Sequence, residues 1–118
     1  MTISEEAKKI TEQNPVAFAT VNDDKPNVIG VAYVKVVSEN QVLITDNYMR
    51  QTKENLKENK NVCLAVWNKN WEGYKLVGTA EYFENGQWKK YVEEMPENKG
   101  LPAKAAILVT VSRLIKLG

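Results

Sequence analysis

The sequence contains no histidine and a single cysteine, and each scarcity excludes a kind of active site. Without histidine the chain cannot build a Ser–His–Asp triad, a papain-type Cys–His pair, a histidine-ligated zinc or a haem with a proximal histidine. One cysteine cannot form an internal disulfide, and because no metal-ligand spacing is present we expect no metal site. Cys63 lies between Val62 and Leu64, so we interpret it as a buried, unreactive thiol.

An excess of charge of either sign is also missing, since 16 basic residues nearly balance 15 acidic ones. A protein that coats nucleic acid needs a basic surplus, so we do not expect nucleic acid as a partner. The longest aliphatic run, residues 105–109, is far too short to span a bilayer, and residues 1–6 are acidic and polar, unlike a secretory signal. We therefore expect a soluble, cytoplasmic protein that does not bind membranes.

Short apolar segments between turn residues make up most of the chain and predict a mainly β fold. The six strands that we expect are residues 16–21, 27–37, 42–45, 62–67, 74–83 and 105–111. Three short helices accompany them, one beginning at a capping box of Thr2 and Glu5, the others over 49–59 and 88–95. So little helix cannot cover both faces of a flat sheet. We therefore expect residues 1–118 to form one domain, a six-stranded antiparallel β-barrel.

Two features of the later strands carry further expectations. Gly78 lies inside the strand 74–83, which predicts a β-bulge or a close approach of another backbone. The end of the chain is more apolar than a chain end requires, and part of it is expected to pack on a partner subunit. The apolar residues concerned are Ile107, Val109, Val111, Leu114, Ile115 and Leu117.

The segment 45–53 joins the end of a strand to the start of a helix and carries the clearest chemical signal. The first turn of a helix leaves backbone N–H groups unpaired and has a positive partial charge. Four hydrogen-bond donors gather there, Arg50, Gln51, Thr52 and Lys53. A planar guanidinium beside free N–H groups suits a phosphate. The alternative is a solvated helix start with incidental charge.

Two stretches resemble a known family, the pyridoxamine-phosphate-oxidase-like FMN-binding split barrels. One runs from Arg50 through Asn55-Leu56 to Asn59–Val62, and the other is Gly73–Glu81, with its Gly-Thr-Ala at 78–80. The resemblance covers nearly the whole chain. The chain departs from the family pattern in having Thr52 where many members have lysine, and Asn59-Lys60 in place of Asn-Pro.

The resemblance implies a homodimeric split barrel with FMN at the subunit interface. It implies roles for three groups of residues. The first group, Arg50, Gln51 and Thr52 with Lys53 close by, would hold the FMN phosphate. The second group, Thr45 and Asp46, would line the flavin, and the third group, Gly30, Val31 and Ala32, would offer backbone groups to the isoalloxazine ring. The small residues of the third group suit close approach to a flat ring.

An aromatic segment over 66–75 allows three interpretations. Its tryptophans could form a wall that stacks on a ring across a dimer interface, or a platform for single-stranded nucleic acid. In the third interpretation Trp67 and Tyr74 belong to the barrel core and Trp71 caps a hairpin.

The leading functional hypothesis is an FMN-binding flavoprotein that acts as a small oxidoreductase, either a flavin reductase or an electron-transfer protein. We assign no catalytic side chain, substrate or redox partner. True pyridoxamine-phosphate oxidase activity is not expected, because the chain has only two arginines and no histidine. The alternative is a non-redox β-barrel that binds another phosphate-bearing cofactor, such as a deazaflavin, or single-stranded nucleic acid.

Overall fold

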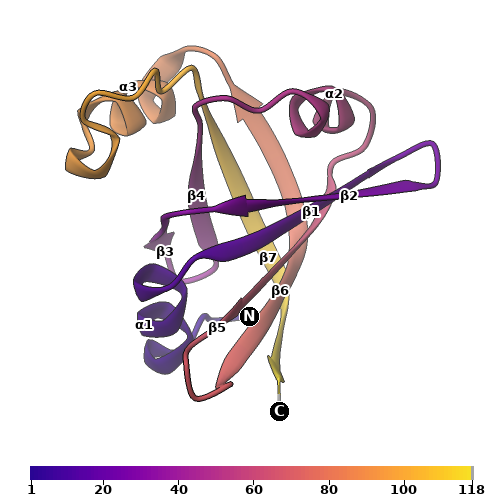
Figure 1. Cartoon of the computed structure of the whole chain (residues 1–118), viewed down its shortest axis with the longest axis vertical. Coiled ribbons are helices and arrows are strands. Elements are labelled where there is room, and N and C mark those ends of the chain that lie inside the picture. Colours follow the sequence, from indigo (N-terminus) through magenta and orange to yellow (C-terminus); the bar gives the residue numbers. More distant parts are fainter. Residues whose placement is uncertain (118) are drawn as a thin grey trace.

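The computed structural model describes residues 1–117, in which one antiparallel sheet wraps around an apolar core (Figure 1). Its elements are α1 (Glu5–Gln13), β1 (Val16–Asn22), β2 (Lys25–Val31), β3 (Val34–Ser38), β4 (Gln41–Asp46), α2 (Gln51–Glu58), β5 (Asn61–Trp67), β6 (Gly73–Phe83), α3 (Gly86–Glu94), the 3-10 turn η1 (Pro96–Asn98) and β7 (Ala105–Leu117). The mainly β class is confirmed. Within residues 1–117 every helix is too short to cross a membrane.

The sheet has seven strands rather than the six expected, in the order β2-β1-β5-β6-β7-β4-β3. The single strand predicted over 27–37 is two strands, because the chain leaves the ladder at Ala32 and Tyr33. These two strands then form opposite edges of the sheet and are not paired with each other. The barrel is therefore split along one side, and each of the edge strands has a row of backbone groups without a neighbouring strand.

The core is filled by alternate residues of the strands, as the period of two requires. In β1 the inward side chains include Val16 and Phe18, and in β5 they include Leu64 and Val66, all at most 1% exposed. Burying each of these side chains contributes about 1.5–3 kcal/mol. α1 and α2 add Ala7, Ile10 and Leu56 to the same core from different ends of the barrel (Figure 1).

Each helix begins or ends away from its predicted boundary. The cap of α1 is Ser4, whose hydroxyl accepts the Ala7 N–H at 3.2 Å, so the predicted Thr2–Glu5 capping box is wrong. Ile3 is instead fixed to the sheet, since its N–H donates to the Glu39 carbonyl at 2.6 Å. The second helix begins at Gln51 rather than at residue 49. α3 spans 86–94 instead of 88–95 and covers the outer face of β4 and β7 through a second apolar cluster.

β6 and β7 form the longest ladder and explain both features predicted there. Their register shifts between Val77 and Gly78, which confirms the bulge. A Cβ at Gly78 would overlap the Thr110 carbonyl oxygen, which confirms the close approach. β7 continues to Leu117 rather than ending at 111.

This longer β7 also corrects the expectation for the apolar chain end. Ile107, Val109 and Val111 are buried in the chain's own core and cannot face a partner. Leu114, Ile115 and Leu117 are partly exposed, so partner packing stays a prediction for these three residues alone.

Candidate functional site

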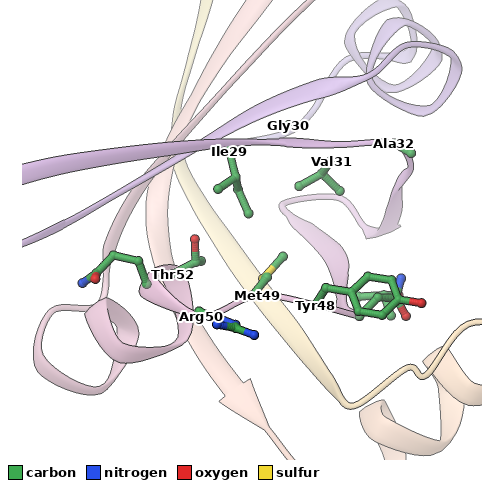
Figure 2. Close-up of a pocket in the computed structure, with 11 residues that line it drawn as sticks. Ile29, Gly30, Val31, Ala32, Tyr48, Met49, Arg50 and Thr52 are labelled. Carbon is green, nitrogen blue, oxygen red and sulfur yellow. The ribbon is translucent and has the colours of Figure 1, made fainter.

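A cavity of about 360 Å³ lies between β2 and the start of α2, within the size range of small-molecule sites. Figure 2 shows Ile29 and Val31 pointing from β2 toward Met49 and Arg50 on the opposite wall. Seven of the nine predicted site residues line it: Gly30, Val31, Ala32, Thr45, Arg50, Gln51 and Thr52. The structure thus brings together two separate segments of the chain, residues 29–32 and residues 45–52.

The α2 end of this cavity is positively polarised. No side chain caps the helix, and the first hydrogen bond of its ladder is donated by the Glu54 N–H to the Arg50 carbonyl at 3.1 Å. The N–H groups of residues 51–53 therefore precede the helical ladder. Arg50 is the one charged side chain among the lining residues, it is exposed, and within residues 1–117 it forms no ion pair. This chemistry suits an anion with several oxygen atoms.

The β2 wall presents backbone rather than polar side chains. Gly30 and Ala32 are exposed, while Ile29 and Val31 turn apolar side chains inward. A Cβ placed on Gly30 would meet no atom within 4 Å, so the chain's own packing does not require glycine there. The space beside Gly30 is open to a group from outside the chain. An edge strand with room beside it can be approached closely by a flat ring.

The structure does not bring the other two predicted residues, Asp46 and Lys53, into the cavity. The Asp46 carboxylate is fully buried and accepts hydrogen bonds from the Met49 N–H at 2.8 Å and the Tyr82 hydroxyl at 2.5 Å. Lys104 Nζ lies 3.9 Å from the same carboxylate. Burial and the neighbouring Asp46 carboxylate raise the pKa of Tyr82, so its hydroxyl stays a donor. Asp46 thereby fixes the loop before α2, which explains why the helix does not begin at Met49.

Lys53 points away from the cavity toward β6. Its Nζ lies 3.7 Å from the Glu84 carboxylate and 5.7 Å from the centre of the Tyr82 ring. Its charge is therefore partly neutralised, and Arg50 is the cation that lines the cavity.

Sequence reasoning missed four lining residues, Ile29, Asn47, Tyr48 and Met49. Ile29 could have been found from Val31, because residues two apart share a face of a strand. The other three lie inside the segment 45–53, which was predicted to join a strand end to a helix start, but they were not named as site residues. They line the cavity because Asp46 holds them in a loop, and because Asn47 Oδ1 accepts the Ala103 N–H at 2.8 Å.

The aromatic segment lies outside this cavity. Tyr74 is buried in the core as predicted, but Trp67 is 45% exposed, so its assignment to the core is wrong. Trp71 is 75% exposed and stacks on Trp67 at a centroid distance of 6.3 Å. Cys63 is partly exposed rather than buried, although burial still raises the pKa of its thiol and keeps it protonated.

The chain is thus a small antiparallel split barrel with a cationic cavity between an edge strand and a helix start. A sequence profile for pyridoxamine 5'-phosphate oxidase matches residues 3–118, and the chain belongs to this family. The uncharacterized protein MJ0282 of Methanocaldococcus jannaschii is 33% identical over 120 residues, covering 98% of this chain and 80% of that protein.

Solved structures share the fold. HupZ of Group A Streptococcus superposes with a TM-score of 0.89 at 24% identity, covering 98% of this chain and 94% of HupZ. An FMN-binding protein from Syntrophomonas wolfei superposes with a TM-score of 0.80 at 15% identity, covering 97% of this chain and 85% of that one. At these identities the likeness concerns the fold alone.

Proposed function

We propose that the protein is an FMN-binding flavoprotein and works as a small oxidoreductase, a flavin reductase or an electron-transfer protein. One observation carries this proposal: Arg50 is the one charge among the lining residues of a cavity whose other wall is the open backbone edge at Gly30. The family supports it, as does the shared fold of the Syntrophomonas wolfei protein named for FMN binding.

The residues present fit FMN at both of its ends. Arg50, Thr52 and the N–H groups at the start of α2 provide donors for a phosphate. Ile29, Val31 and Met49 provide apolar surface for a flat ring. When bound, the flavin supplies the electron-transfer chemistry.

The chain's own role is to bind, to orient and to exclude water. No residue that lines the cavity, among residues 1–117, is a carboxylate, a thiol or a lysine. The site therefore offers no side chain that exchanges protons near neutral pH, and protons would come from water or from the substrate.

We further propose a homodimer that completes the site. α3 covers one outer face of the sheet, whereas the outer face of β2, β1, β5 and β6 carries, beside Lys75, many small or apolar residues that are partly or fully exposed. They are Ala17, Ala19, Val21, Val28, Gly30, Cys63, Ala65, Trp67 and Val77. An exposed apolar surface of this kind is typical of an interface.

A shallow apolar cavity of about 320 Å³ lies on this outer sheet face, beside Val28 and Trp67. Ile29 and Gly30 line both this cavity and the one at α2. A second copy seated on the outer sheet face would therefore reach the edge of the proposed flavin site, which is why we place FMN at the interface.

The test is a titration of the purified protein with FMN and with riboflavin, which lacks the phosphate, followed by flavin absorbance and by fluorescence quenching. We expect FMN to co-elute with the protein and to bind about tenfold or more tightly than riboflavin, because a charge-assisted hydrogen bond is worth about 1.5–3 kcal/mol. A colourless protein that leaves added FMN free in solution would contradict the proposal.

A further inference from the structure

A partly buried network of polar side chains lies directly beneath the start of α2. Asn27 Nδ2 on β2 donates to Thr52 Oγ1 at 3.1 Å and to Thr20 Oγ1 at 3.3 Å. Asn55 Nδ2 donates to Thr20 Oγ1 at 2.9 Å, and Gln51 Nε2 donates to Asn55 Oδ1 at 2.7 Å. Thr20, Thr52 and Asn55 are at most 3% exposed. The network links the β1–β2 hairpin to the helix that carries the cationic end of the cavity.

The network determines whether the Thr52 hydroxyl can donate a hydrogen bond to a ligand. A threonine hydroxyl has one proton to donate and two lone pairs that accept. The Asn27 amide nitrogen can only donate, so it occupies a lone pair of Thr52 Oγ1 and leaves the proton unused. Within residues 1–117 the structure provides no acceptor for that proton, and Thr52 lines the cavity beside Arg50. The Thr52 hydroxyl can therefore donate its proton to a ligand in the cavity.

We infer that Asn27 is a positioning residue that sets the preference of the site for an unprotonated phosphate. Asn27 does not line the cavity and acts through Thr52. With the proton of Thr52 kept free, the hydroxyl adds one donor to those of Arg50 and the N–H groups at the start of α2. A phosphate dianion accepts such hydrogen bonds more strongly than a neutral hydroxyl group does. This inference rests on the proposed FMN site and names the part of the chain that selects the phosphate end of the ligand.

Asn27→Asp and Asn27→Ala test the inference by the ratio of the FMN and riboflavin dissociation constants. The carboxylate of Asn27→Asp would accept the Thr52 proton and place a negative charge behind it. We expect FMN affinity to fall by about tenfold or more and riboflavin affinity to stay the same. Asn27→Ala should lose less FMN affinity than Asn27→Asp, since it removes the donor to Thr52 without adding a charge. Asn85→Asp, an exposed residue at the start of α3, is the matched control and should keep the ratio.

A double-mutant cycle separates positioning from a structural role. Thr52→Val removes the hydroxyl, so adding Asn27→Ala to it should not change the FMN to riboflavin ratio further. A second readout avoids destabilised variants: in the wild-type protein the Asn27 side-chain amide resonances should shift with FMN and not with riboflavin.

The failure of the inference and the failure of the proposed function are distinguishable. A wild-type protein that binds no FMN would remove the proposed function and the inference with it. If wild type prefers FMN but both Asn27 variants keep that preference, the inference is overturned while the FMN site stands. Equal losses of FMN and riboflavin, or amide resonances that ignore FMN, would also overturn it.

Discussion

At the scale of single residues, two glycines of the sheet have opposite reasons to be glycine. Gly78 sits where a Cβ would overlap the Thr110 carbonyl, whereas the space beside Gly30 is open. Gly78→Ala should therefore destabilise the fold by about 1–3 kcal/mol or more, because strand β7 must shift. Gly30→Ala should change the free energy of unfolding by less than about 0.5 kcal/mol.

The same Gly30→Ala variant tests the flavin wall. If FMN approaches the backbone there, the added methyl should weaken FMN binding by about tenfold at unchanged stability. Urea unfolding measures the free energy of unfolding of Gly78→Ala and Gly30→Ala, and an FMN titration measures the FMN affinity of Gly30→Ala. Undiminished FMN affinity in Gly30→Ala would show that the flavin does not lie against the outer side of β2 at Gly30.

Tyr82 provides a prediction for the pH dependence of stability. Burial and Asp46 raise the pKa of Tyr82 above its usual value, so the folded state keeps this proton more firmly than the unfolded state. The contribution of the protonated Tyr82 hydroxyl to the free energy of unfolding is fully present below about pH 10. This contribution is lost as the pH rises through the raised pKa of Tyr82. Tyr82→Phe should reduce the loss of stability above about pH 10, and at neutral pH it should cost about 1–3 kcal/mol, because one buried Asp46 oxygen loses its donor.

Urea unfolding from pH 7 to pH 11 measures both effects. Tyr48→Phe, at a side chain that is 72% exposed, is the control and should behave as wild type. An unchanged alkaline profile in Tyr82→Phe would mean that the buried pair with Asp46 does not couple to folding.

At the scale of the elements, Arg50, the residue directly before α2, would supply the positive charge that binds the phosphate. Arg50→Ala should weaken FMN binding by about 10- to 100-fold and leave riboflavin binding unchanged, because only the phosphate contact is lost. Arg113→Ala changes the other arginine of the chain, which lies on β7, and serves as the matched control. Equal FMN affinity in Arg50→Ala and wild type would place the phosphate away from α2.

The elements also show how far the sequence could predict this site. The strand end at Thr45 and the helix start at Arg50 are local signals, and both were predicted close to their positions. The orientation of Asp46 was not, because it depends on Tyr82, which lies 36 residues later in the chain. The break between β2 and β3 was missed because β-branched residues continue on both sides of Ala32 and Tyr33. The network around Asn27 joins three elements, so no local pattern reveals it.

At the scale of the whole molecule, the three helices protect the sheet unevenly. α1 and α2 add side chains to the main core, and α3 covers the outer face of β4 and β7. The Glu12 carboxylate of α1 also accepts the Val36 N–H at 2.8 Å and so covers part of the β3 edge. The other edge, β2, and the outer sheet face around it keep partly exposed apolar groups. A small domain gains further apolar burial by sharing such a face with a second copy.

The dimer prediction follows from this uneven cover. Light scattering at micromolar concentration should give the mass of two chains for the wild type. Ala65→Glu places a charge on the outer sheet face, at a residue that is already partly exposed. The fold should tolerate the change, whereas the dimer should not, because burying the added carboxylate at an interface costs several kcal/mol even beside Lys75, its cross-strand neighbour.

FMN affinity should fall together with the dimer in Ala65→Glu, since Gly30 belongs both to the cavity at α2 and to the outer sheet face. Gln87→Glu adds the same charge at an exposed position of α3 and should remain dimeric with unchanged FMN affinity. A monomeric wild type would refute the interface. A monomeric Ala65→Glu that binds FMN as tightly as the dimer would show that one chain completes the site alone.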